Sequence, residues 1–109
     1  MNNRRGWTQR DEREWFAAVG AIDECVICGK WGTQVSHSNE HRGIGQKAPP
    51  WHTAAICPDC HHEIDNGRHL SRDERRRMHR DAVNATHIIL IQRGTMPGTR
   101  ARTEREHAS

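Results

Sequence analysis

The sequence predicts one small α+β domain that needs a cross-link in addition to its hydrophobic core, and three observations support this prediction. The chain has 109 residues, the length of a single domain, with 33% hydrophobic residues and a mean hydropathy of −1.00. Its four cysteines form two CxxC pairs, Cys25 with Cys28 and Cys57 with Cys60. Helical and β-prone patterns alternate around these pairs. A core this thin is marginal by itself, so the cysteines are the expected staple.

Composition also excludes some classes of protein. No apolar run approaches the roughly 20 residues that a membrane span needs, and the first residues contain no apolar signal core. The sequence therefore predicts a soluble, cytoplasmic protein without a membrane partner. Lys and Arg number 17 against 14 Asp and Glu, a net charge of +3, which permits an anionic partner without requiring one.

The first expected element is a helix that ends at Gly20. Thr8 stands three residues before Asp11, the spacing of a capping box. An apolar stripe at helical spacing follows, formed by Trp15, Phe16 and Val19. The tryptophans are interpreted as core residues, with stacking on nucleic-acid bases as the alternative.

The two CxxC pairs predict a structural zinc site. The inner cysteines are separated by 28 residues, and two CxxC turns can direct four thiolates at one ion about 2.3 Å away. Binding of a structural zinc is coupled to folding, which would supply the missing stability. Two disulfides or a redox-active CxxC remain the alternatives.

The segments after each pair predict a treble-clef arrangement over about residues 23–70. Gly29 and Lys30 are typical of a zinc knuckle, and residues 33–37 form a short β-prone run. A loop is expected over 41–50, and a helix that begins at the second pair should stop at Asn66 and Gly67. The order is knuckle, hairpin and helix.

A second helix and a tail complete the chain. Ser71 and Glu74 match a capping box, and a polar helix is expected to continue at least to about Ala85. Residues 87–92, HIILIQ, are the most β-like run, although periodicity alone leaves the end of a buried helix open. The expected domain spans 1–94, and the Arg-rich, Pro- and Gly-containing segment 95–109 is expected to be disordered.

Positive charge is concentrated between residues 66 and 80, which contain six arginines against two acids. Arg68, Arg72 and Arg76 have the spacing of one helical face and could follow a phosphate backbone. A solvated helix face explains the same pattern equally well.

Seven of the nine histidines lie between residues 37 and 79, and four cysteines already suffice for zinc. His61 and Asp65 share a helical face and could bind a second, catalytic divalent ion, with a capping role as the alternative for His61. His37, at the end of the β-prone run, could act as a general base at neutral pH if the hairpin brings it to the helix.

Five elements in this order resemble the HNH, or ββα-metal, nucleases with a four-cysteine zinc lobe. They are CVIC, VSH, GIGQKAPP, TAAICPDCHHEID with GR, and THIILIQRG, covering about residues 23–94. The resemblance is greatest to small phage and prophage nucleases related to the recombination-enhancement nuclease. Three positions depart from the family pattern. Many relatives have Asp or His where Ser36 stands, and they often have Asp where Pro50 stands. His52 lies nearest to the place where the family motif has Asn.

The resemblance implies a divalent-metal-dependent endonuclease that hydrolyses DNA, with a recombination protein as a further possible partner. His37 would activate water, and His61 would bind a catalytic Mg or Mn ion together with Asp65, where many relatives have histidine. His41 and His52 are further candidate ligands, and the backbone contacts are expected from Arg42, Lys47, Arg68, Arg72, Arg75 and Arg76. The rival hypothesis is a non-catalytic treble-clef module that binds nucleic acid or a recombination protein.

Overall fold

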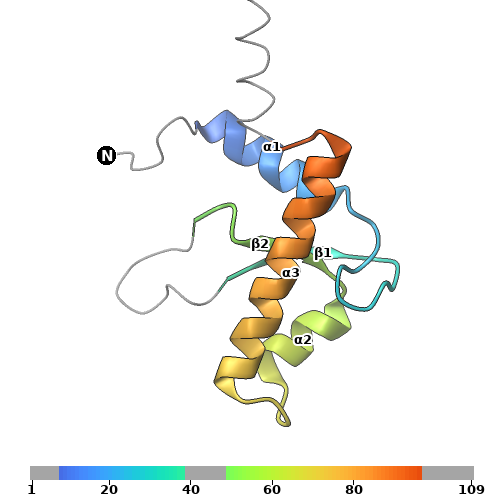
Figure 1. The fold of residues 1–109 in the computed structure, drawn as a ribbon, viewed down its shortest axis with the longest axis vertical. Coiled ribbons are helices and arrows are strands. Elements are labelled where there is room, and N and C mark those ends of the chain that lie inside the picture. Colours follow the sequence, from blue (N-terminus) through green and yellow to red (C-terminus); the bar gives the residue numbers. More distant parts are fainter. Residues whose placement is uncertain (1–7, 39–48, 97–109) are drawn as a thin grey trace, which may run out of the picture.

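The protein is a mixed α+β fold, as the sequence predicts, in a computed structural model that describes residues 8–38 and 49–96. The described part contains three helices and one two-stranded antiparallel sheet (Figure 1). In chain order these are α1 (Gln9–Gly20), β1 (Gln34–His37), β2 (Thr53–Ile56), α2 (Pro58–Asn66) and α3 (Arg72–Arg93). The long helix α3 runs across the sheet, with α1 near its C-terminal end and α2 near its N-terminal end.

Helix α1 begins and ends as its sequence predicts. The Thr8 side chain accepts a hydrogen bond from the backbone of Asp11, and the Asp11 carboxylate accepts one from the backbone of Thr8. This reciprocal capping box satisfies backbone donors that the first helical turn leaves without partners. The buried stripe of the helix, Trp15 and Val19, faces the sheet and α3.

The sheet has only two strands, and other parts of the chain cover the edge of β2 that does not pair with β1. Strands β1 and β2 pair in register from Gln34 opposite Ile56 to His37 opposite Thr53. On the other edge of β2, the Ala55 carbonyl accepts from Val26 N at 3.1 Å, and the Ala55 amide donates to Thr86 Oγ1 at 3.2 Å. The first cysteine loop and α3 therefore satisfy backbone groups that a two-stranded sheet would otherwise leave unpaired in the core.

Helix α3 continues beyond Ala85, and the β-like run 87–92 lies inside it, which is the helical alternative left open by the sequence. The helix starts with the predicted capping box of Ser71 and Glu74 and ends at Gly94, whose φ of +69° is left-handed. The segment is helical and not extended because helical spacing buries Val83, Thr86 and Leu90 on one side of α3. Ile88 and Ile91 are left exposed, which a buried strand would not do. In the described part of the chain, no helix is both long and apolar enough to cross a membrane.

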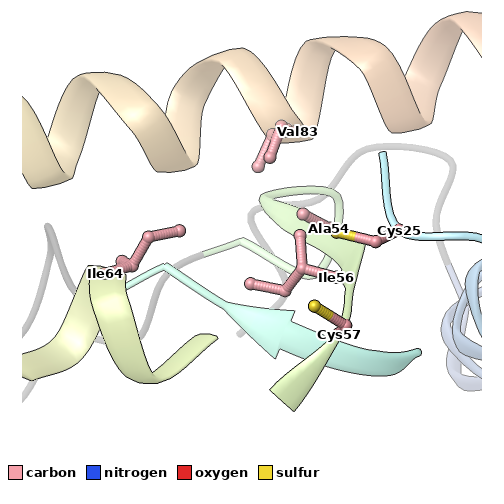
Figure 2. Packing of buried hydrophobic residues seen from close by; sticks show 7 residues of the cluster. Cys25, Ala54, Ile56, Cys57, Ile64 and Val83 are labelled. Carbon is pink, nitrogen blue, oxygen red and sulfur yellow. The ribbon is translucent and has the colours of Figure 1, made fainter. Parts of the chain in front are cut away.

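The core consists of two clusters on opposite faces of β2. Ala54 and Ile56 pack with Val83 of α3, Ile64 of α2 and the buried Cys57, as Figure 2 shows. Ala55 faces the other cluster, which also contains Trp15, Val19, Ile22 and Leu90. All four residues of β2 are buried, so this strand is the point where both helical layers and the cysteine loops meet.

The prediction that the tryptophans are core residues is correct for Trp15 and wrong for Trp31. Trp15 is 1% exposed and its Nε1 donates to Thr53 Oγ1 at 2.7 Å, whereas Trp31 is 76% exposed. Trp31 follows the turn of the first cysteine pair and forms an isolated β-bridge with Glu24.

Trp15→Phe is expected to lower the free energy of unfolding by roughly 1–3 kcal/mol, because it removes a buried hydrogen bond and leaves a void. Trp31→Phe is the matched control and should change it little, since that ring is mostly in water. Urea unfolding of the metal-loaded proteins measures both. Equal losses in the two variants would contradict the assignment of Trp15 to the core.

Candidate metal centre and anion cavity

The four cysteines of the two CxxC pairs come together in one cluster. One ligand atom from each of Cys25, Cys28, Cys57 and Cys60 lies within 4.8 Å of the other three. Cys25 and Cys28 come from the turn before β1, and Cys57 and Cys60 from the first turn of α2. The predicted grouping of these residues is confirmed, and the cluster is close enough to hold a metal ion such as zinc.

The separation of the sulfurs matches a tetrahedral thiolate site. A metal to sulfur bond of about 2.3 Å implies sulfur to sulfur distances of about 3.8 Å around a tetrahedron. Cys28 Sγ and Cys57 Sγ, from different pairs, are 3.7 Å apart. A disulfide needs about 2.05 Å, so this pair is not bridged.

Backbone amides stabilise charge on the sulfurs. Cys25 Sγ accepts from the amides of Ile27 and Cys28 at 3.4 and 3.5 Å, and Cys57 Sγ accepts from Cys60 N at 3.4 Å. Burial would raise the pKa of Cys25, but hydrogen bonds from backbone amides outweigh it and lower the pKa to about 6. Thiolate is the form that binds metal, so the loop favours the binding form of this residue.

An exposed ion pair joins the two CxxC turns. Lys30 Nζ lies 2.8 Å from an Asp59 carboxylate oxygen. This contact raises the pKa of Lys30 and lowers the pKa of Asp59, in both cases mainly through the hydrogen bond between them. Lys30 also places positive charge near Cys57 and Cys28, which partly balances the charge of a four-thiolate site.

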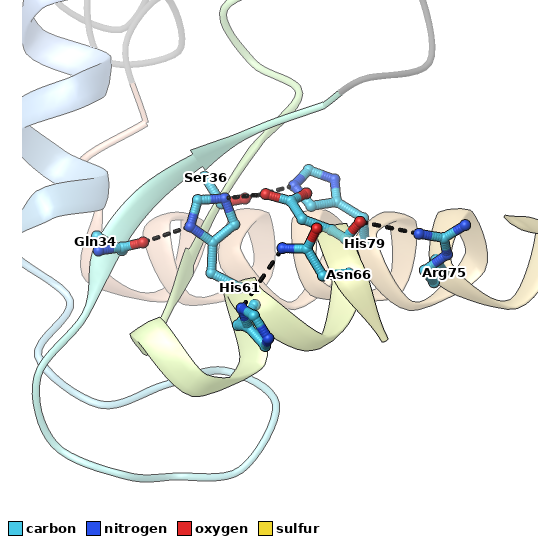
Figure 3. Close-up of polar contacts among 8 residues, drawn as sticks. Gln34, Ser36, His61, Asn66, Arg75 and His79 are labelled. Atoms are coloured by element: carbon cyan, nitrogen blue, oxygen red, sulfur yellow. Dashed lines mark hydrogen bonds and ion pairs between the residues drawn. The ribbon is translucent and has the colours of Figure 1, made fainter. Parts of the chain in front are cut away.

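His61 and Asp65 form the second candidate site, one helical turn apart on α2. His61 Nε2 lies 3.1 Å from an Asp65 carboxylate oxygen, and each side chain is about one-third exposed. The other ring nitrogen, Nδ1, hydrogen-bonds Gln34 Oε1 of β1 (Figure 3). Gln34 therefore orients the imidazole so that Nε2 faces the Asp65 carboxylate, and one ion could contact both groups.

His37 has different neighbours from His61. Alternation along β1 puts Gln34 and Ser36 on the face toward α2 and α3, and puts His37 on the opposite face. The His37 ring packs against Phe16 of α1, with ring centroids 5.5 Å apart. Direct contact between the two imidazoles is not formed in the described structure, although His37 lines the same cavity as Asp65.

That cavity lies between the end of β1, the C-terminal half of α2 and the first two turns of α3. Its volume is about 250 Å³, and its lining residues are His37, Ser38, Ile64, Asp65, Arg72, Arg75, Arg76 and His79. His79 is buried, and its Nε2 lies 3.1 Å from Ser36 Oγ. The structure thus brings three of the predicted arginines to the same cavity as Asp65.

Arg68 is not among the lining residues, and the predicted face of Arg68, Arg72 and Arg76 is wrong in this respect. Gly67 ends α2 and α3 begins only at Arg72, so Arg68 lies in the connection between the two helices. The face that forms is Arg72, Arg75, Arg76 and His79, at relative positions 0, 3, 4 and 7.

The sequence analysis missed Gln34, Ser36 and His79 as partners of the site. The period of two along the strand could have paired Gln34 with Ser36, and the spacing of 3, 4 and 7 could have grouped His79 with the arginines. No sequence signal pairs β1 with a particular turn of α3, however.

Two candidate ligands lie elsewhere or cannot be placed. His52 is half-buried just before β2, where its ring packs near Trp51, and its carbonyl accepts from Ser38 N. His41, Arg42 and Lys47 lie outside the described residues, as does most of the predicted tail. Within residues 8–38 and 49–96, the cysteine cluster is the one group of three or more potential ligands, so His61 and Asp65 are a pair only.

Comparisons with protein-family models, with curated proteins and with solved structures find no match for this chain.

Proposed function

We propose that this protein is a divalent-metal-dependent HNH endonuclease that hydrolyses DNA phosphodiester bonds, built on a treble-clef zinc lobe. One observation carries the proposal. The His61 and Asp65 pair, oriented by Gln34, adjoins a cavity lined by three arginines, immediately after a cysteine cluster that can bind zinc. Metal ligands beside concentrated positive charge suit a phosphodiester substrate.

The donor set fits a catalytic Mg or Mn ion. Mg usually keeps several waters and is held by one or two carboxylates together with phosphate oxygens of the substrate, so a site with few protein ligands is sufficient. Asp65 would supply the carboxylate oxygen and His61 the imidazole nitrogen. When bound, the ion would stabilise negative charge on the phosphate and on the leaving oxygen.

Other residues around the cavity supply the general base, orient His61 and bind the substrate backbone. His37, exposed at the end of β1, lines the cavity although its ring packs against Phe16, and a rotation of the side chain toward the cavity would let it accept the proton of the attacking water. Gln34 holds His61 in one orientation through Nδ1. The arginines at positions 72, 75 and 76 bind backbone phosphates, which would give affinity with little sequence preference.

The test is cleavage of plasmid and single-stranded DNA by zinc-loaded protein with added Mg or Mn, compared with Asp65→Asn. Wild type should cut at least one substrate, and the variant should lose cutting because the amide carries no charge to bind the ion. Retained zinc and an unchanged unfolding curve would show that the variant is folded.

The competing function is a zinc module that binds nucleic acid without cleaving it. It is favoured by the finding that only the cysteines form a group of three or more ligands in the described ranges. Saturable DNA binding by wild type, with every substrate left intact under all metal conditions, would support this function and refute the nuclease.

A further inference from the structure

One wall of the cavity between β1, α2 and α3, which we call the arginine cavity, is formed by side chains of α3. Four side chains on consecutive turns of one face of the helix line the cavity, whose volume is about 250 Å³. They are Arg72, Arg75, Arg76 and His79. Ser36 holds the His79 ring through Nε2 at 3.1 Å, and both residues are buried. Part of the cavity wall is therefore fixed before any ligand arrives.

Arg75 is the best placed of these side chains. Its Nη1 donates to the Asp65 carbonyl oxygen at 2.9 Å, which ties the guanidinium to the end of α2 (Figure 3). Its Nε is buried, yet it has no hydrogen-bond partner among the described residues. A buried donor without a partner is costly, and the guanidinium fork matches the oxygens of a phosphate or carboxylate.

Charge in the cavity favours an anion. Three guanidinium groups line it, whereas Asp65 is the one carboxylate among the lining residues and lies 3.1 Å from the His61 ring. At about 250 Å³, the cavity lies just below the roughly 300–1,000 Å³ of pockets for drug-sized ligands and has room for a phosphate group.

We infer that this cavity binds one backbone phosphate of a nucleic-acid strand and that Arg75 is its anchor, through the guanidinium group that lines the cavity. The inference rests on the proposed function for the identity of its ligand. It goes further by separating Arg75 from the other arginines of α3, which a simple positive surface would not do.

The first test compares the binding of a fluorescein-labelled single strand by anisotropy, with zinc-loaded protein and no added Mg or Mn. Arg75→Gln should weaken binding about tenfold or more. Arg77→Gln removes the same charge from an exposed residue of the same helix that does not line the cavity, and should weaken it less than about twofold. Equal losses in the two variants would overturn the inference.

A second variant separates charge from geometry. Arg75→Lys keeps the positive charge but has no donor at the position of Nε, so its affinity should stay at least about threefold below that of wild type. Full recovery by lysine would reduce the role of Arg75 to general electrostatic attraction and would contradict an anchor.

The third measurement uses wild type alone, in case Arg75 variants fold poorly because of the lost contact with Asp65. The Nε–H resonance of Arg75, assigned in isotope-labelled wild type by connecting the side chain to the backbone of residue 75, should shift saturably on titration with inorganic phosphate at constant ionic strength, while that of Arg77 stays in place. An unmoved Arg75 resonance would overturn the inference.

The two proposals fail separately, because binding is measured without the catalytic ion. Selective loss of binding in Arg75→Gln, with no cutting by wild type, would keep the phosphate site and refute the nuclease. Cutting that depends on Asp65, with equal effects of the Arg75 and Arg77 variants, would do the reverse.

Discussion

Cys57→Ser is expected to leave the domain largely unfolded at room temperature. Cys57 is fully buried, caps the N-terminus of α2 through its sulfur and belongs to both the metal cluster and the core. Structural zinc contributes on the order of 10 kcal/mol in small metallodomains, whereas whole domains are stable by about 5–15 kcal/mol. Loss of one ligand therefore removes a stabilisation comparable to the total.

Circular dichroism and metal analysis measure this effect. Wild type should contain one zinc per chain, lose its helical signal with a strong chelator and recover it with zinc but not with Mg. Lys30→Ala is the control, since it removes the exposed contact with Asp59 and a nearby positive charge but no ligand, and should retain the zinc. A folded, metal-free wild type would show that the cysteines are not a structural metal site.

His61→Ala is expected to reduce Mg-dependent cleavage about 100-fold or more, because it removes one of the two protein ligands proposed for the catalytic ion. Gln34→Ala should cost about tenfold, since Gln34 does not touch the ion but orients His61 through Nδ1. Raising the Mg concentration should restore part of the Gln34→Ala rate and much less of the His61→Ala rate.

His62→Ala is the matched control on the same helix. Its ring lies near Asn66 at 3.5 Å and outside the arginine cavity, so cleavage should be unchanged. All three variants must retain zinc, because His61 directly follows Cys60. Normal cleavage by His61→Ala would exclude His61 as a ligand, and equal loss in His62→Ala would indicate a general disturbance of α2.

Local sequence signals predicted the element boundaries well wherever a chemical cap defines them. Thr8 with Asp11 and Ser71 with Glu74 start α1 and α3, and Gly67 follows the end of α2. The run 87–92 was harder, because its β-branched residues favour a strand locally while a helix that began fifteen residues earlier continues through them. Packing of Leu90 against Trp15 and Ala55 decides the outcome.

The candidate site shows the same division. The spacing of two CxxC pairs was enough to group the cysteines, and the helical period was enough to pair His61 with Asp65. Other contacts depend on how β1 lies relative to the helices. They are the hydrogen bond of Gln34 to His61, the packing of His37 against Phe16 and the contact of Ser36 with His79.

The amino-acid sequence by itself determined the mixed α+β class, the two CxxC turns and the capped starts of α1 and α3, because each depends on residues a few positions apart. Only the tertiary structure decided which side chains share the cavity. Contacts between β1 and α3 join residues more than forty positions apart, Ser36 and His79 among them, and they arise from packing around β2 rather than from any local preference.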